Sequence, residues 1–455
     1  MKKLEKRAIL CLLCAAVLVI GLGIFIAEFA VKGSTWASYP ANQHIYKDGN
    51  LTTGTIYDVN GTKLAENTKD GINYNDDAAI RRATVHTVGD RNRSISSSAE
   101  SAFQSKLVGY NIITGVYDSG NRDLYLTIDA DICKAANEAL AGRSGTVGVY
   151  NYETGDILCL VSSPNFDPEN PPAVSSDDTS GLYMNRFFSS AIVPGSIFKL
   201  VTASAVIENR SNLDSWEYTC TGKAVYGSDT ITCPMVHGHQ NFYDALANSC
   251  NGAFAQLAQD VGAETLQEYV DKYKLNKSVD VNGIQTAAGS FSFPEDNNVF
   301  LAWAGIGQYE DLINPCSYLR FVGAIAGGGS AAEPRIISTV KYKIGLPAGI
   351  YKTKNTGTLI EEDTALEMQS MMKNNVEKTY GEGNFPGLDI YAKSGTAEVG
   401  GGKAPNSWFT GFIKNEGYPY AFIVLVENGG YGSVVAGAVA NKVMQAVIAT
   451  APHEN

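Results

Sequence analysis

The chain has 455 residues, of which 44% are hydrophobic and 18% are charged. This length is enough for two or three domains, each with a hydrophobic core of its own. The formal net charge of −12 argues against a nucleic-acid partner, because nucleic acids bind basic surfaces.

The N-terminus predicts a membrane anchor. Lys2, Lys3, Lys6 and Arg7 precede an uncharged run over 8–27. A helix of that length, at about 1.5 Å rise per residue, spans about 30 Å, the thickness of the hydrocarbon core of a bilayer. The run is long for a cleaved signal peptide and no clear cleavage site follows, which favours a retained anchor over 1–31. The basic flank predicts a single-pass protein of the cell membrane whose first seven residues are cytoplasmic and whose residues after about 32 are extracytoplasmic.

Residues 32–141 are expected to form a small N-terminal module, a stalk or dimerisation-type unit with no evident chemistry. It starts with a polar link over 33–50. A hairpin is predicted over 51–67, because Asn60-Gly61 is a favoured two-residue turn between strands. A strand over 124–129 then leads into a helix over 130–141, for which Asp129 is the predicted N-cap.

Residues 142–455 are expected to form an α+β domain, a five-stranded antiparallel sheet flanked by helices. Two strands at its start and three near its end have short connections, which favour antiparallel pairing. The apolar spacing between them predicts helices. The expected strands are 146–150, 156–163, 388–399, 407–414 and 420–427, and the expected helices are 196–209, 242–248, 252–262, 264–273, 316–326 and 434–450.

The helix expected over 196–209 begins directly after Pro194-Gly195. It places the hydroxyl of Ser196 and the amine of Lys199 three residues apart, on one face of the first turn. Serine attacks a carbonyl only when a base takes its proton, and lysine can do so only when its pKa falls well below about 10.4. Burial against the helix can lower that pKa. The pattern alone is common in helices.

Two further motifs follow in the same domain. Ser249-Cys250-Asn251 lies at a break between helical segments, and Lys393-Ser394-Gly395-Thr396 lies on the strand expected over 388–399. Gly395 is expected to let a ligand approach the strand edge closely. The order S-x-x-K, S-x-N, K-[ST]-G is the motif set of penicillin-binding proteins and class A β-lactamases. Each part is common, but the three in order form a specific signal.

The sequence resembles the class B penicillin-binding proteins, membrane-anchored peptidoglycan D,D-transpeptidases, over nearly its whole length. Thr53, where these proteins usually carry arginine, and Ser394, in place of the commoner threonine, depart from the pattern without threatening the chemistry. Outside the three motifs, the matching stretches are 54–61 with Leu64-Ala65, 126–129, 151–164, Asn185-Arg186, 193–201, the region of Cys220, Cys233 and His237-Gly238, 305–308 with Pro315, Ala397-Glu398, 407–409 and 411–412.

The resemblance implies a penicillin-binding transpeptidase fold, related to that of β-lactamases, and a serine acyltransferase that cross-links stem peptides. Ser196 would attack the penultimate D-alanine and form an acyl-enzyme, with Lys199 as the general base. Ser249, helped by Lys393, would pass the proton to the departing D-alanine. The mutual repulsion of the two lysines would help to keep Lys199 neutral.

Substrate binding is implied in the same way. Asn251 would hold an amide of the peptide, and Ser394, Gly395 and Thr396 would form the site for its terminal carboxylate. The backbone N–H groups of Ser196 and Thr396 would form an oxyanion hole. β-Lactams would inhibit covalently, no cofactor or metal is expected, and a separate glycosyltransferase is the implied protein partner.

The cysteines leave two alternatives open. Cys220 and Cys233 flank a hairpin-like segment with its turn at 226–229, and a disulfide between them would stabilise the fold by roughly 3 kcal/mol. Alternatively, Cys233 with His237 and His239 could ligate a metal, although their irregular spacing makes zinc the weaker interpretation.

Two rival functions compete with transpeptidation. A β-lactamase needs a carboxylate to activate water, for which Glu310 and Asn314 superficially offer a pair, but the anchor and the N-terminal module argue against it. A drug sensor would carry more membrane segments and a cytoplasmic effector. The sequence leaves open a third alternative, a scaffold that uses the acylation site only for binding and does not turn over.

Overall fold

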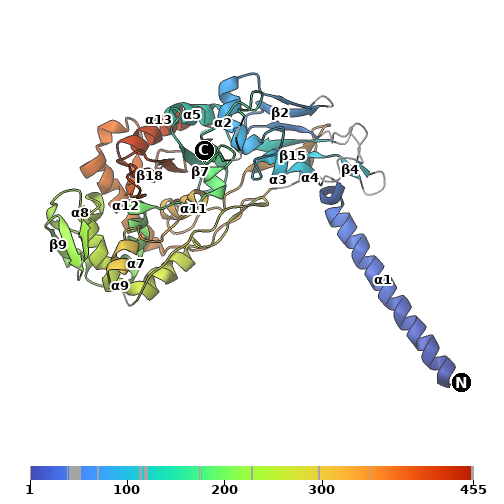
Figure 1. Cartoon of the computed structure of the whole chain (residues 1–455), viewed down its shortest axis with the longest axis horizontal. Coiled ribbons are helices and arrows are strands. Elements are labelled where there is room, and N and C mark those ends of the chain that lie inside the picture. The colour runs from blue at the N-terminus through green and yellow to red at the C-terminus, as the bar shows by residue number, and fades with distance from the viewer. Residues whose placement is uncertain are drawn as a thin grey trace.

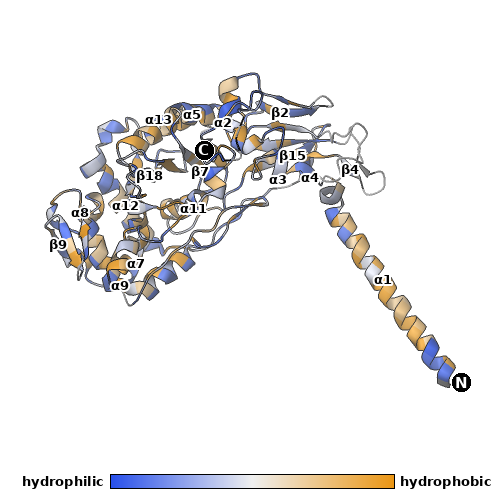
Figure 2. Cartoon of the chain, viewed as in Figure 1, coloured by the Kyte–Doolittle hydropathy of each residue, from blue (hydrophilic) through white to orange (hydrophobic). Residues whose placement is uncertain are grey.

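The computed structural model describes residues 2–37, 39, 53–68, 71–111, 115–116, 121–173, 175, 177–226, 229–295, 298–349 and 351–451. Most of the link predicted over 33–50, and the centre of the turn predicted at 226–229, lie outside these residues. Helix α1 (Lys2–Ala37) extends away from the folded body (Figure 1). It is apolar over most of its length (Figure 2), and it is long and apolar enough to cross a membrane. Because α1 ends at Ala37, it extends past the anchor predicted over 1–31 and into the link predicted over 33–50.

A six-stranded sheet with the order β16-β15-β6-β1-β2-β3 combines four strands from the N-terminal part of the chain with two from much later in the sequence. The hairpin predicted around Asn60-Gly61 is confirmed, because β1 and β2 pair antiparallel on either side of it. The strands are β1 (Thr55–Tyr57), β2 (Lys63–Thr68), β3 (Gly71–Tyr74), β6 (Arg122–Leu126), β15 (Ile337–Tyr342) and β16 (Pro347–Gly349). Around this sheet lie α2 (Ala78–Val88), α3 (Ala99–Ala102), α4 (Gln104–Leu107) and the short pair β4 (Tyr110–Asn111) and β5 (Gly115–Val116).

The division predicted between residues 141 and 142 stays a prediction, and two elements cross it. Strand β15, far along the sequence, pairs with β6 and extends the N-terminal sheet. Helix α5 (Ala130–Leu140) packs against β8 (Ile157–Ser163) and α13 (Val435–Thr450), which both lie after the predicted boundary. The predicted N-cap of α5 is confirmed, because Asp129 accepts the N–H groups of Asp131 and Ile132 at 2.9 and 3.1 Å.

The second sheet has five antiparallel strands in the order β17-β18-β19-β7-β8, as predicted. The hairpin of β7 and β8 comes from the start of the domain, and the meander of β17, β18 and β19 comes from its end. Antiparallel pairing of β7 with β19 joins them into one sheet. The strands are β7 (Gly145–Asn151), β8 (Ile157–Ser163), β17 (Ile390–Ala397), β18 (Asn406–Ile413) and β19 (Tyr420–Val426). Strand β17 is an edge strand, so one side of it is free to border a site.

Helices cover both faces of this sheet. Figure 1 shows α13 (Val435–Thr450) and α5 on one side and α11 (Pro315–Ala326) on the other. Every residue of α11 is buried, as expected of a helix enclosed by other elements. Helix α12 (Glu362–Asn375) packs on β17 and α7, and it continues through a π-helical turn, η6 (Val376–Tyr380).

A helical region completes the domain beside β17. Helices α7 (Lys199–Asn209) and α10 (Asn298–Ala304) both pack on α9 (Asn251–Lys272). The two helices predicted over 252–262 and 264–273 are confirmed, because Gly262 has a non-helical conformation with φ of +83° that breaks α9 into two helices. The remaining elements are α6 (Arg186–Ser189), η4 (Gly195–Phe198), η5 (Leu213–Ser215), β9 (Glu217–Cys220), β10 (Lys223–Tyr226), β11 (Asp229–Thr232), β12 (Gly238–Asn241), α8 (Phe242–Ala247), β13 (Asp280–Val281), β14 (Ile284–Gln285) and η7 (Glu382–Asn384).

Candidate active site

Ser196 lies in the 3₁₀ turn η4, directly before α7, and the chain enters this turn through a glycine in a left-handed conformation. The φ of Gly195 is +55°, which disfavours residues with a Cβ. A Cβ on Gly195 would lie 2.7 Å from the carbonyl oxygen of Thr396 and 2.9 Å from Ala397 Cα. Glycine at this position therefore lets the turn carrying Ser196 pack directly against β17.

Lys199 is fully buried, and its amine is surrounded by the other motifs. Its Nζ lies 3.1 Å from Ser196 Oγ, 2.7 Å from the carbonyl oxygen of Ser249 and 2.7 Å from Asn251 Oδ1. Burial lowers the pKa of Lys199 to about 8, because a charged amine is destabilised away from water. The neutral amine has a lone pair with which it can accept the proton of Ser196.

Ser249 connects the two lysines of the site. It has a φ of +51°, which is uncommon for a residue with a side chain, and it lies in the tight turn between α8 and α9. Its Oγ lies 3.2 Å from Lys199 Nζ and 3.1 Å from Lys393 Nζ. A proton can therefore pass between either amine and this hydroxyl.

Lys393 projects from β17 and is also fully buried. Its Nζ donates to the carbonyl oxygen of Ser394 at 2.7 Å. Its pKa lies well below the ordinary value, first because of burial and then because of the neighbouring charge of Lys199. The pKa of Lys199, by contrast, is lowered by burial, while the thiols of Cys250 and Cys233 oppose the shift. The mutual repulsion expected to keep Lys199 neutral thus lowers the pKa of Lys393, whereas burial lowers that of Lys199.

Asn251 has both ends of its side chain bonded within the protein. Its Oδ1 accepts from Lys199, and its Nδ2 donates to the carbonyl oxygen of Thr232 at 2.8 Å. The side chain also borders the cleft. Its expected contact with a peptide amide stays a prediction, and its observed role is to hold Lys199.

The edge of β17 differs in one respect from the expectation for Gly395. A Cβ at this position would lie 3.0 Å from both Ile197 Cγ2 and the carbonyl oxygen of Pro194. The observed need for glycine is therefore the close packing of η4 on the strand, and a ligand contact at Gly395 stays a prediction. Thr396 Oγ1 accepts the N–H of Gly432 at 3.3 Å, and Ser394 Oγ lies 3.0 Å from the hydroxyl of Tyr380.

These groups surround a cleft of about 520 Å³. Ser196, Ser249, Asn251, Ser394 and Thr396 line it, whereas Lys199 and Lys393 lie beneath the wall. Two other lining residues, Gln308 and Glu398, fall in stretches that match the family. The sequence did not indicate Trp303, Tyr380, Tyr431 and Gly432, which also line the cleft. Tyr380 has the clearest role, because its hydroxyl also accepts the N–H of Ser394 at 2.8 Å.

The pair proposed for a β-lactamase does not border the cleft. Asn314 is fully buried as the N-cap of α11, where its Oδ1 accepts the N–H of Ser317. Its Nδ2 donates to the carbonyl oxygens of Phe187, Phe188 and Ser190. Glu310 is exposed and is not among the residues that line the cleft. Neither residue is placed to activate a water molecule at Ser196.

The cysteines depart from both sequence alternatives. All eight cysteines lie at described positions and all are free thiols, so the Cys220–Cys233 disulfide is not formed. The metal set predicted from Cys233, His237 and His239 is also incomplete. His239 is exposed and pairs with Glu217, whereas Cys220 and Cys250 join the other two residues in one cluster.

Comparison with known proteins agrees with this geometry. The peptidoglycan D,D-transpeptidase PbpA of Mycobacterium tuberculosis is 26% identical over 333 residues, covering 68% of this chain and 67% of the relative. Stage V sporulation protein D of Bacillus subtilis is 25% identical over 350 residues, covering 71% of this chain and 53% of the relative.

Solved structures show the same fold. The ceftriaxone acyl-enzyme of penicillin-binding protein A from M. tuberculosis has a TM-score of 0.77 at 22% identity, covering 87% of this chain and 98% of that one. A structure of penicillin-binding protein 2 from Pseudomonas aeruginosa has a TM-score of 0.73 and also 22% identity, covering 89% and 97% of the two chains.

The penicillin-binding protein transpeptidase domain model matches residues 145–445, a range that contains all three motifs. Because this match covers well over half of the chain, the protein belongs to the penicillin-binding protein transpeptidase family.

Proposed function

We propose that this protein is a peptidoglycan D,D-transpeptidase that cross-links stem peptides through an acyl-enzyme at Ser196. One observation carries the proposal: the buried amine of Lys199 lies 3.1 Å from Ser196 Oγ, at the wall of an open cleft. A nucleophile with a base at hydrogen-bond distance is the arrangement that covalent acyl transfer needs.

Acylation begins when Ser196 Oγ attacks the carbonyl carbon of the penultimate D-alanine and Lys199 takes the hydroxyl proton. The negative oxygen of the tetrahedral intermediate is held by the backbone N–H groups of Ser196 and Thr396. Such donors contribute about 3–4 kcal/mol each where they have been measured. The intermediate collapses when the C–N bond to the terminal D-alanine breaks.

The leaving amine needs a proton, and Ser249 is the group placed to supply it. Its Oγ touches both amines, so the proton taken by Lys199 can reach the departing D-alanine through this hydroxyl. The amine of a neighbouring stem peptide then attacks the Ser196 ester, and the same groups work in the reverse direction. The products are the cross-linked peptide and free Ser196.

Substrate orientation comes from β17. Ser394 and Thr396 line the cleft, where their hydroxyl groups would bind the terminal carboxylate, and Lys393 would add positive potential when protonated. The hydroxyl of Tyr380 fixes Ser394. A β-lactam carries a comparable carboxylate and a reactive amide, so it would acylate Ser196 and stop the cycle, as in the acyl-enzyme structures of M. tuberculosis penicillin-binding protein A.

The test is labelling with a fluorescent penicillin followed by a cross-linking assay with lipid-linked precursor. Wild-type protein should form a stable adduct and cross-linked product, and Ser196→Ala should do neither. Labelling of the Ser196→Ala variant would refute the assignment of the nucleophile. Rapid hydrolysis of the penicillin over many turnovers would instead indicate a β-lactamase, and a stable adduct without any cross-linking would indicate a scaffold.

The anchor and the partner belong to the same proposal. Helix α1 would hold the protein in the cell membrane, with the basic residues before it in the cytoplasm and the catalytic domain outside. Protease added to spheroplasts should then cleave the catalytic domain, and cleavage that requires lysed cells would contradict this orientation. A separate glycosyltransferase would supply the glycan strands, which cross-linking in cells followed by purification of this chain would identify.

A further inference from the structure

A glutamate that the acyl-transfer steps do not use lines the cleft beside Ser196. Among the described residues that line this cleft, Glu398 alone is an aspartate, glutamate, lysine or arginine. Its side chain is exposed, and its carboxylate forms no hydrogen bond or ion pair with the described part of the chain. The carboxylate of Glu398 is therefore available to a ligand in the cleft.

The position of Glu398 along the chain continues the row of substrate-binding groups on β17. Ser394, Thr396 and Glu398 all line the cleft, whereas Gly395 and Ala397 between them are buried. Residues two apart on an extended chain share one face, which explains this alternation. Two residues of chain span up to about 7 Å. Glu398 therefore lies up to about 7 Å beyond Thr396, on the same side of the strand.

The order of the groups along β17 gives the direction in which a bound donor peptide runs. Under the proposed function, on which this inference rests, the Ser394 and Thr396 hydroxyls hold the terminal carboxylate. The backbone N–H of Thr396 holds the oxygen of the scissile carbonyl, one residue earlier in the peptide. The peptide residues before the scissile bond then continue toward Glu398, along an edge strand that an extended peptide can follow. The third stem residue, directly before the penultimate D-alanine, comes nearest to Glu398.

The charges along this wall are opposite at its two ends. The buried amine of Lys393 contacts the carbonyl oxygen of Ser394, whereas the carboxylate of Glu398 lies at the far end of the row. A peptide with a terminal carboxylate and an ammonium group on its third residue has the complementary pattern. An extended peptide advances about 3.3–3.6 Å per residue, and a lysine side chain adds a flexible four-carbon stem. An amine on the third residue can therefore reach Glu398.

Tyr431 adds an apolar surface to the same cleft. Its ring is largely exposed and lines the cleft. The next residue, Gly432, donates its N–H to Thr396 Oγ1 at 3.3 Å, and a Cβ on Gly432 would clash with the carbonyl oxygen of Gly395. The segment that carries Tyr431 thus packs directly on the end of β17. An aromatic ring at this place suits the methylene groups of a lysine-type side chain whose amine stays in water.

We propose that Glu398 selects donor stem peptides whose third residue carries a free side-chain amine, by pairing with its ammonium group while Ser196 is acylated. The residue determines specificity and moves no proton, because the amine lies one residue away from the scissile bond. An ion pair between exposed groups is weak and is screened by salt. The expected effect is therefore a preference of about two- to fivefold in kcat/KM at low salt.

The test compares two synthetic donors that differ in charge at the third residue. Both are stem peptides that end in a D-alanyl thioester, one with L-lysine and one with ε-N-acetyl-L-lysine. Release of the thiol, measured by chromatography, gives kcat/KM for acylation, which does not depend on the later attack by an acceptor amine. Full-length wild type in detergent should prefer the lysine donor about two- to fivefold at about 50 mM salt, and less at about 0.5 M.

Charge variants of Glu398 supply the decisive comparison. Glu398→Gln should take the two donors at equal rates, and Glu398→Lys should reverse the preference. The matched control is Glu310→Gln, because Glu310 is an exposed glutamate that does not line the cleft, and this variant should keep the wild-type preference. Each preference is a ratio within one protein, so a general loss of activity or partial unfolding does not imitate the result.

Failure of this role and failure of the proposed function give different results. Equal rates for the two donors in wild type, or a preference that survives in Glu398→Gln, would overturn the role of Glu398 alone. An effect of Glu398→Gln confined to the attack of an acceptor amine on the acyl-enzyme would also overturn it, because the ammonium site would then belong to the acceptor peptide. Wild type that forms no penicillin adduct and releases no thiol from either donor would overturn the proposed function and the role of Glu398 together.

Discussion

The buried amine of Lys199 makes the rate of Ser196 acylation depend on pH. Burial lowers its pKa to about 8, whereas an ordinary lysine has a pKa of about 10.4. Only the neutral amine can take the proton of Ser196. The acylation rate should therefore rise as the pH increases through 8, level off above it, and fall about tenfold per pH unit well below it.

The lowered pKa of Lys199 determines how much of the amine is neutral at a given pH. At pH 7 an amine with a pKa near 8 is neutral in about one molecule in ten, compared with about one in 2,500 at the ordinary value. Burial thus increases the active fraction by about 200-fold. Lowering the pKa from about 10.4 to about 8 means that burial destabilises the charged amine, relative to the neutral one, by about 3 kcal/mol.

The groups that face Lys199 decide which titration is observed. Lys393 contacts the same Ser249 hydroxyl as Lys199, and burial together with the charge of Lys199 holds its pKa well below the ordinary value. The thiols of Cys233 and Cys250 raise the pKa of Lys199, and the ring of Phe254 lies 5.7 Å from the amine. The midpoint near 8 is therefore assigned to Lys199 within a coupled set.

The assay is the second-order rate constant for acylation by fluorescent penicillin between about pH 5.5 and 9.5, with protein-free samples to correct for hydrolysis. Circular dichroism over the same range separates titration from unfolding. Lys199→Arg, which cannot lose its proton, should react about 10²–10⁴-fold more slowly and without the rise. A flat wild-type profile, a midpoint near 10 or an unchanged profile in Lys199→Arg would refute this role of the amine.

Three substitutions test the frame around the cleft. Gly195→Ala should slow acylation at least tenfold and destabilise the protein by about 1–3 kcal/mol. The control is Gly400→Ala, because Gly400 has a similar φ of +70° but open space where a Cβ would lie, so this variant should lose stability without slower acylation. Equal acylation rates in the two variants would contradict the packing argument. Tyr380→Phe removes the hydroxyl that fixes Ser394, so KM should rise about 5–30-fold with kcat nearly unchanged, and a fall confined to kcat would count against this assignment. Asn314→Ala leaves three buried carbonyl groups with fewer partners, and chemical denaturation should show a loss of about 2–4 kcal/mol while penicillin labelling of the folded protein persists. Loss of labelling by a stably folded Asn314→Ala would restore the residue to the active site.

The sequence predicted the parts of the molecule in which local chemistry decides the structure. Asp129 before an apolar helical stretch predicted the cap that the structure shows, and the short connections between successive strands predicted antiparallel pairing. The three motifs predicted which side chains should meet, although Lys199 and Ser249 are far apart in the sequence. Their resemblance to a known family, and not their spacing, supplied that prediction.

Non-local contacts account for most of what the sequence did not predict. The pairing of β15 with β6 joins segments on either side of the predicted domain boundary, and nothing in either strand specifies the partner. Tyr380 enters the cleft because α12 ends in a π-helical turn. The signal for α12 itself was present, since Ala365, Met368 and Met372 are buried at helical spacing.

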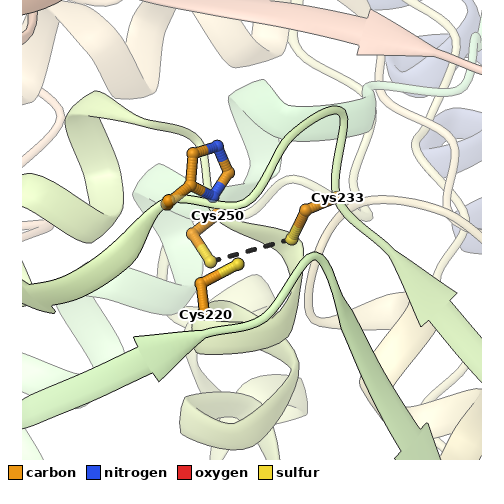
Figure 3. Close-up of side chains that lie close together, drawn as sticks. Cys220, Cys233 and Cys250 are labelled. Atoms are coloured by element: carbon orange, nitrogen blue, oxygen red, sulfur yellow. Dashed lines mark hydrogen bonds between the residues drawn. The ribbon is translucent and has the colours of Figure 1, made fainter.

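The middle position of the S-x-N motif shows why the grouping of Cys220, Cys233, His237 and Cys250 was overlooked. Motif analysis assigns roles to Ser249 and Asn251 and treats the residue between them as variable, so Cys250 received no role. Cys220, the β11–β12 connection that carries both Cys233 and His237, and Cys250 are brought together only by the tertiary fold. The tight turn that directs the Ser249 and Asn251 side chains toward Lys199 also directs the intervening Cys250 side chain toward Cys233 (Figure 3). Cys250 is covalently joined to both residues that contact Lys199, so a substitution that displaces the Cys250 side chain should also change the contacts of the base.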